Sequence, residues 1–257
     1  MSNKTEKIMA RVQVHYERAC GHYGEDNVLG VFLYGSQNYN CDLETSDVDT
    51  KCILVPNLYH LAIEPYATNH LHIHREDDKD PEVCECMTIQ HMVENWKKQN
   101  CNFLEIMFTP YCIINPRYYD IWNNFLVKEN YRELIARYDV RRGILSPAHQ
   151  AISTIKRNPM FGKAIANGVR LIHYLENYTK GMPYRNCFWL SEHDAMIVRA
   201  FKMGARGVRY VDAPNLIAAF EDFIQAAEDY PGPRTELNDV LADFVMSLIK
   251  TRCSLDK

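Results

Sequence analysis

An unbroken apolar run, VLGVFLY, occupies residues 28–34. Because side chains alternate between the two faces of a strand, a strand that is apolar throughout has to be buried on both faces. No apolar run in the chain is longer, and this one falls far short of the roughly 20 residues that cross a bilayer. The start at residues 1–4 also lacks the apolar stretch of a secretory signal. We therefore expect a fully buried strand in a soluble, cytoplasmic protein that does not enter a membrane.

Strand and helix patterns alternate through the first half of the chain. Three further segments have the composition of strands, namely residues 47–56, 71–75 and 83–88. Residues 5–20 have the periodicity of a helix. From Ile89 onward apolar residues recur three and four positions apart, and Thr88 stands where a helix N-cap is expected. These patterns predict a mixed α/β unit.

Helical patterns replace this alternation beyond Pro116. They are clearest at residues 165–175 and 237–248, and no further strand pattern is convincing. The expected fold class is therefore α/β, in the sense of α+β. We expect an α/β domain at residues 1–116 and a helical domain at residues 117–257.

Composition and charge exclude several classes of protein. With 47% hydrophobic and 24% charged residues, the chain is neither disordered nor fibrous. Nine cysteines, an odd number without any Cys-x-x-Cys pair, argue against a disulfide framework. The net charge of −4 argues against a protein that coats nucleic acid, although basic residues outnumber acidic ones between residues 132 and 210. That basic segment is a candidate for contacts with phosphates.

Two polar elements after the buried strand carry recognisable chemistry. At Gly35 the missing Cβ lets the backbone approach a ligand closely, and Ser36 offers an amide and a hydroxyl to a phosphate oxygen. Asp47 and Asp49 open the next expected strand, where their spacing places both carboxylates on one face. One or two carboxylates together with substrate phosphates are the usual ligands of Mg²⁺.

A hydrophobic strand, Gly-Ser, ten residues and then Asp-hydrophobic-Asp resemble the signature of the DNA polymerase β-type nucleotidyltransferase superfamily. The likeness extends to a branch of predicted bacterial and phage nucleotidyltransferases, whose motif runs Gly-Ser-x-x-Tyr-Gly and, after a short loop, Ser-Asp-x-Asp. Here the two parts are GSQNYN at residues 35–40 and SDVD at residues 46–49. Asn40 replaces the usual glycine, and asparagine tolerates positive φ. Looser similarities lie at residues 100–108, 162–181 and 201–204.

The resemblance implies a fold, an activity and cofactors. The fold would be an N-terminal nucleotidyltransferase palm with a mixed β-sheet, followed by a helical domain on one side of a nucleotide cleft. The activity would be metal-dependent transfer of a nucleoside monophosphate, by default AMP from ATP, to an acceptor hydroxyl with release of pyrophosphate. Asp47 and Asp49 would bind two Mg²⁺ ions, or Mn²⁺, and Gly35, Ser36 and Tyr39 would bind the nucleotide. The acceptor stays open between a tRNA, a protein and a small molecule.

The superfamily also needs a third carboxylate on a later strand. Glu82 and Glu85 are the candidates in the strand-like segment that follows the turn-rich residues 76–81. Because they are three positions apart, they face opposite sides of a regular strand, and at most one can join the aspartates. Glu85 is favoured as the catalytic and metal-binding residue because it lies deeper in the strand. A carboxylate in that apolar stretch needs a partner, and a bound cation would be one.

Lys163 and Arg170 are the candidates for phosphate binding in the basic segment. They are seven residues apart, which is two helical turns, and so share one face of a helix. Further basic candidates in this segment are Arg141, Arg142, Lys156 and Arg157.

Two alternatives to this interpretation stay open. A zinc site could combine His70, His72 and His74 with Cys84 and Cys86, although Cys-x-Cys lacks the usual ligand spacing. The fold could also serve as a non-catalytic nucleotide-binding sensor or interaction module. The presence of both aspartates in the motif favours catalysis, because a pure binder has less use for two metal-bridging carboxylates.

Overall fold

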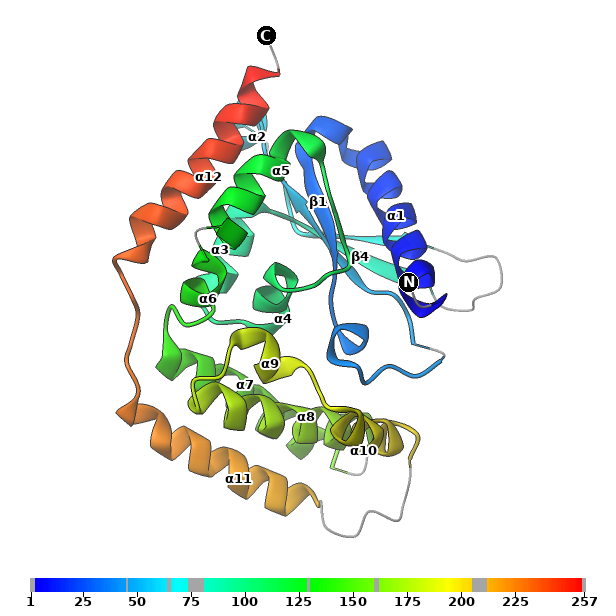
Figure 1. The fold of residues 1–257 in the computed structure, drawn as a ribbon, viewed down its shortest axis with the longest axis vertical. Helices are drawn as coiled ribbons and strands as arrows, with labels where there is room; N and C mark the ends of the chain where they lie inside the picture. Colours follow the sequence, from blue (N-terminus) through cyan, green and yellow to red (C-terminus); the bar gives the residue numbers. More distant parts are fainter. Residues whose placement is uncertain are drawn as a thin grey trace.

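The structure is a computed structural model that describes residues 3–44, 46–63, 66–73, 81–128, 130–159, 162–204 and 212–255. A five-stranded sheet carries helices on both faces, and a further group of helices lies below it in the view of Figure 1. None of the helices in the described ranges combines the length and the apolar character needed to span a bilayer.

The sheet has the strand order β3-β4-β2-β1-β5. Its strands are β1 (Val28–Leu33), β2 (Thr50–Leu54), β3 (Asn69–Ile73), β4 (Glu82–Thr88) and β5 (Cys112–Ile114). Strands β2 and β4 run parallel and all other neighbours run antiparallel, so the sheet is mixed. The four strands expected from the sequence are confirmed, with ends that differ by up to three residues. Strand β5 was not expected, because three residues are too few to show a period.

Helix α1 (Asn3–Tyr23) covers one face of the sheet. Ile8 and Val12 on its apolar stripe are buried in one cluster with Val31 and Cys52 from the central strands. Every residue of β1 is buried, which confirms the prediction of a strand enclosed on both faces.

The opposite face is covered by α3 (Ile89–Lys97), α4 (Cys101–Leu104), α5 (Pro116–Trp122) and α12 (Leu237–Ser254). The hydroxyl of Thr88 accepts a hydrogen bond from the His91 amide at 3.3 Å, which confirms the predicted N-cap of α3. Although α12 ends the described chain, it packs beside α5 and α3, and its Phe244 stacks on Phe125 with ring centroids 4.1 Å apart.

The helices below the sheet confirm the helical character expected of the second half. They are α6 (Tyr131–Ile135), α7 (Val140–Arg157), α8 (Gly162–Thr179), α9 (Tyr184–Phe188), α10 (Glu192–Lys202) and α11 (Ala213–Ala226). Helix α2 (Leu58–Ala62), the π-helical turn η4 (Asn123–Lys128) and the short 3-10 turns η1 (Glu25–Asn27), η2 (Ser36–Tyr39), η3 (Glu105–Met107) and η5 (Ala227–Asp229) complete the described elements. One continuous cluster of buried apolar side chains joins the inner face of the sheet to these helices.

Candidate active site

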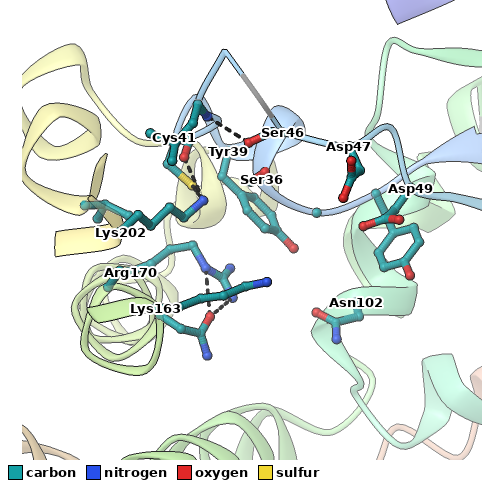
Figure 2. A pocket seen from close by; sticks show the side chains of 16 residues that line it. Ser36, Tyr39, Cys41, Ser46, Asp47, Asp49, Asn102, Lys163, Arg170 and Lys202 are labelled. Carbon is teal, nitrogen blue, oxygen red and sulfur yellow. Dashed lines mark hydrogen bonds between the residues drawn. The ribbon is translucent and has the colours of Figure 1, made fainter. Parts of the chain in front are cut away.

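A cavity of about 510 Å³ lies between the loop that follows β1 and the helices α8 and α10 (Figure 2). Of the eight residues favoured for catalysis, metal binding or nucleotide binding, seven line it, namely Gly35, Ser36, Tyr39, Asp47, Asp49, Lys163 and Arg170. Glu85 is the exception. The fold thus brings together residues that the sequence separates by more than a hundred positions.

The loop after β1 forms the turn η2 between two residues with positive φ. Gly35 has φ +89°, a conformation that L side chains rarely adopt, and a Cβ built there would meet no atom within 4 Å. Glycine is therefore required by the backbone and leaves open space for a ligand. Asn40 has φ 59° in the left-handed region, a conformation that asparagine tolerates, as expected from the sequence.

Asp47 and Asp49 lie just before β2, whereas the sequence placed them inside that strand. Hydrogen bonds still fix the backbone at this point. The carbonyl of Asp49 accepts a hydrogen bond from the Tyr34 amide at 3.1 Å, and the carbonyl of Asp47 accepts one from the Gln37 side chain at 2.9 Å. Val48 between them is buried on the α1 side of the sheet. Both aspartates consequently line the cavity, as the alternation of side chains predicts.

Asp49 is the more buried carboxylate of the site, and its charge is affected by its neighbours. Burial, and then the charge of Asp47, raise the pKa of Asp49 above its usual value, while the Val83 amide and the charge of Lys163 act in the opposite direction. Within the described ranges, no three His, Cys, Asp or Glu side chains are grouped so that they could hold a metal ion by themselves. Two carboxylates that share a cation with substrate phosphates are the usual ligand pattern of Mg²⁺, so binding of Mg²⁺ at Asp47 and Asp49 stays a prediction.

Glu85 shares the sheet face of Asp49, because it pairs in register with Lys51, two residues further along. Its carboxylate accepts a short hydrogen bond from the Lys51 ammonium. That ammonium is buried between the rings of Tyr34 and Phe103, at 4.1 and 4.2 Å from their centroids. The partner that the sequence argument required for Glu85 is thus a lysine. Its role as the third carboxylate stays a prediction.

Three basic side chains form the wall opposite the aspartates. Lys163 and Arg170 both project from α8, as their spacing predicts, and Lys202 comes from α10. The Arg170 guanidinium lies 4.2 Å from the centroid of the Tyr39 ring and donates to Asn167 at 2.8 Å. The Lys202 ammonium, which the sequence analysis did not single out, donates to a backbone carbonyl of the loop at 2.7 Å. The cavity thus has basic side chains on one wall and the two aspartates on the other.

Glu105 is a buried carboxylate that sequence reasoning also missed. It accepts hydrogen bonds from the Gly35 amide and the Asn38 side chain, each at 3.3 Å, and from the Tyr39 hydroxyl. Burial raises the pKa of Glu105 to about 7, against the lowering effects of Tyr39 and of the nearby Arg170 charge. Its place in the apolar run at residues 104–108 was the available signal, because a buried carboxylate needs partners.

No model of a known protein family matches the chain, and no curated protein does.

The zinc alternative finds no support in the arrangement of the strands. His70 and His72 pair with Glu85 and Val83 and are exposed, whereas the alternating positions Cys84 and Cys86 are buried on the α1 side of the sheet. The sheet separates the two sets of side chains. His74 lies outside the described residues.

The other basic candidates do not line the cavity. Arg141 pairs with Glu228 at 3.1 Å, and Arg157 donates to Ser153 on its own helix at 2.8 Å. Ordinary surface contacts therefore account for these two arginines.

Proposed function

We propose that this protein is a metal-dependent nucleotidyltransferase that moves a nucleoside monophosphate, by default AMP from ATP, to an acceptor hydroxyl and releases pyrophosphate. The observation that carries the proposal is the meeting of three groups in one cavity: the Gly35–Ser36 turn, the aspartate pair and the basic wall of α8 and α10. A mixed sheet followed by a largely helical second half supports this proposal, and the bounds of a palm domain at residues 1–116 and a helical domain at residues 117–257 stay predictions.

Each group has a distinct task in this proposal. Ser36 donates its hydroxyl and amide to phosphate oxygens. The Gly35 amide does not take this task, because it already donates to Glu105. Lys163, whose charge acts on Asp49 across the cavity, neutralises the triphosphate from the opposite wall. Asp47 and Asp49 would hold Mg²⁺, which when bound supplies charge stabilisation at the phosphoryl oxygens. Positioning and electrostatics suffice for the transfer, so no protein nucleophile is needed.

Glu85 is the proposed third carboxylate. It lies on the face of the sheet that carries Asp49, in a partly buried position where it pairs with the ammonium of Lys51. Glu85→Gln is expected to lower turnover while the affinity for nucleotide stays unchanged.

Transfer of label from each α-labelled nucleoside triphosphate tests the proposal directly. The protein is incubated with Mg²⁺ and with total RNA, lysate protein or a small-molecule extract as acceptor, and pyrophosphate release is measured in parallel. We expect labelled acceptor with ATP. Asp47→Asn and Asp49→Asn should each reduce turnover by about 10³-fold or more with an unchanged melting temperature, because each removes a charge that holds the metal.

Asp42→Asn is the matched control, since Asp42 belongs to the same loop but pairs with Lys4 and does not line the cavity. Near-normal turnover in either aspartate variant would contradict the assignment. Tight binding of ATP without transfer to any acceptor would identify the nucleotide-binding sensor instead.

A further inference from the structure

A buried ionic cluster lies on the α1 face of the sheet, behind the cavity. It consists of Arg11 and His15 from α1 and Glu82 from the first position of β4. His15 and Glu82 are fully buried, and the Arg11 side chain is 24% exposed. None of the three lines the cavity, and the chemistry proposed above uses none of them.

The two oxygens of the Glu82 carboxylate face different parts of the protein. Oε2 accepts from Nε of Arg11 at 2.8 Å and lies 3.0 Å from Nε2 of His15. Oε1 accepts from the backbone amide of Val48 at 3.3 Å. Val48 is the residue between the two aspartates. The carboxylate therefore joins α1 to the backbone at the centre of the aspartate motif.

A second contact involves the residue that follows Asp49 in the sequence. Nδ1 of His15 lies 2.8 Å from the hydroxyl of Thr50, the residue that follows Asp49. A third comes from Val83, the neighbour of Glu82, whose amide donates to the Asp49 carboxylate itself. The start of β4 and one histidine of α1 thus hold the residues on both sides of Asp49 from the face opposite the cavity.

A buried ionic cluster of this kind is not explained well by a gain in folding stability alone. The cost of burying charges often exceeds the attraction between them, and apolar side chains of similar volume can replace a buried ion pair without loss. Although burial by itself would raise it, hydrogen bonds from His15 and Arg11 hold the pKa of Glu82 down to about 2. The carboxylate is therefore charged at neutral pH and available to the Val48 amide.

We propose that Glu82, oriented by Arg11 and His15, is a positioning residue that fixes the backbone around Asp49, so that both aspartate carboxylates can bind one divalent cation in the cavity. This inference rests on the proposed function, because that function assigns the cation to the aspartates.

Titration of the full chain with Mn²⁺ alone, followed by electron paramagnetic resonance, tests this role. Glu82→Gln and Arg11→Gln are expected to weaken Mn²⁺ binding about tenfold, and Arg11→Lys, which keeps the charge, should restore most of the affinity. Gln13→Ala is the matched control on α1, where Gln13 contacts only the exposed Glu17 in the contacts described. In the transfer assay the same variants should lower kcat and leave KM for the nucleotide unchanged.

Wild-type affinity for Mn²⁺ in both Glu82→Gln and Arg11→Gln would overturn the inference, and so would an equal loss in Gln13→Ala. If Glu82→Gln does not fold, Arg11→Gln decides, because its side chain is partly exposed. The two proposals fail in different ways. A wild-type protein that transfers nucleotide, with variants that bind Mn²⁺ normally, overturns only the positioning role. A protein whose Mn²⁺ affinity follows the cluster but which transfers nothing overturns only the proposed function.

Discussion

Glu82 and Glu105 are both buried glutamates, yet their surroundings favour opposite charge states. Glu82 faces two cationic side chains, and its pKa is held at about 2. Its contribution to stability is therefore present above a pH of about 4.5 and is lost as the pH falls toward 2. Glu105 is bonded by neutral donors, and burial raises its pKa to about 7. The contribution of Glu105 to stability is consequently present at low pH and is lost as the pH rises toward 7.

Replacing Glu105 by glutamine should change how stability depends on pH. Between about pH 4.5 and pH 7 the folded protein keeps a proton on Glu105 that the unfolded chain has lost, so stability falls as the pH rises through this window. From pH 5 to pH 8 the wild type should lose about 2 kcal/mol more than Glu105→Gln, which has no such proton. Urea denaturation of both proteins at the two pH values measures the difference.

Glu94→Gln serves as the control, because Glu94 is a largely exposed glutamate on α3. Its dependence on pH should match that of the wild type. A Glu105→Gln variant with the same dependence as the wild type would show that Glu105 is ionised throughout this range.

Helix α10 and the turn before it bind the loop that carries Ser36. Three successive backbone carbonyls of the loop, at residues 39, 40 and 41, accept hydrogen bonds from the helical half. The donors are the Leu190 amide at 3.3 Å, the Arg199 guanidinium at 3.3 Å and the Lys202 ammonium at 2.7 Å. The position of the loop therefore depends on a helix that lies more than 150 residues away in the sequence.

Lys202→Met should weaken the binding of nucleoside triphosphate about tenfold or more. The substitution removes a hydrogen bond to the loop and a positive charge from the cavity, and a hydrogen bond to a charged group contributes about 1.5–3 kcal/mol. Calorimetric titration with ATP and Mg²⁺ measures the affinity. Lys156→Met, which removes an exposed lysine of α7 outside the cavity, should bind as the wild type does. Equal affinities in the two variants would contradict a role for Lys202 at the site.

Sequence periodicity predicted the positions of individual strands and helices better than it predicted how these elements pack against one another. The apolar run at residues 28–34 was sufficient to predict strand β1. The Asp-x-Asp spacing was sufficient to predict that both aspartates face the same side. No local sequence pattern predicted that Lys51 lies between two aromatic rings and pairs with Glu85. Such contacts depend on the register of β2 against β4, and that register is set by tertiary packing rather than by a sequence period.

Phe244→Ala tests how far the sheet half of the molecule depends on α12. Phe244 is buried and stacks on Phe125, and Trp96 and Trp122 lie within about 6.3 Å of its ring centroid. Its removal should cost about 3–5 kcal/mol of unfolding free energy, measured by urea denaturation. Met246→Ala, an exposed position on the same helix, should change stability by less than about 0.5 kcal/mol. A small loss in Phe244→Ala would show that α12 contributes little to this core.

Because α12 packs against elements from the first half of the chain, part of the core can form only late in translation. The Arg252 guanidinium donates to the Asn27 side chain at 2.6 Å, so the final helix contacts the turn that leads into β1. A ribosome releases that turn and the central strands long before it releases α12. The apolar surface around Trp96 and Phe125 therefore stays partly uncovered until nearly all of these residues have emerged, and exposed apolar surface of this kind favours aggregation of a nascent chain.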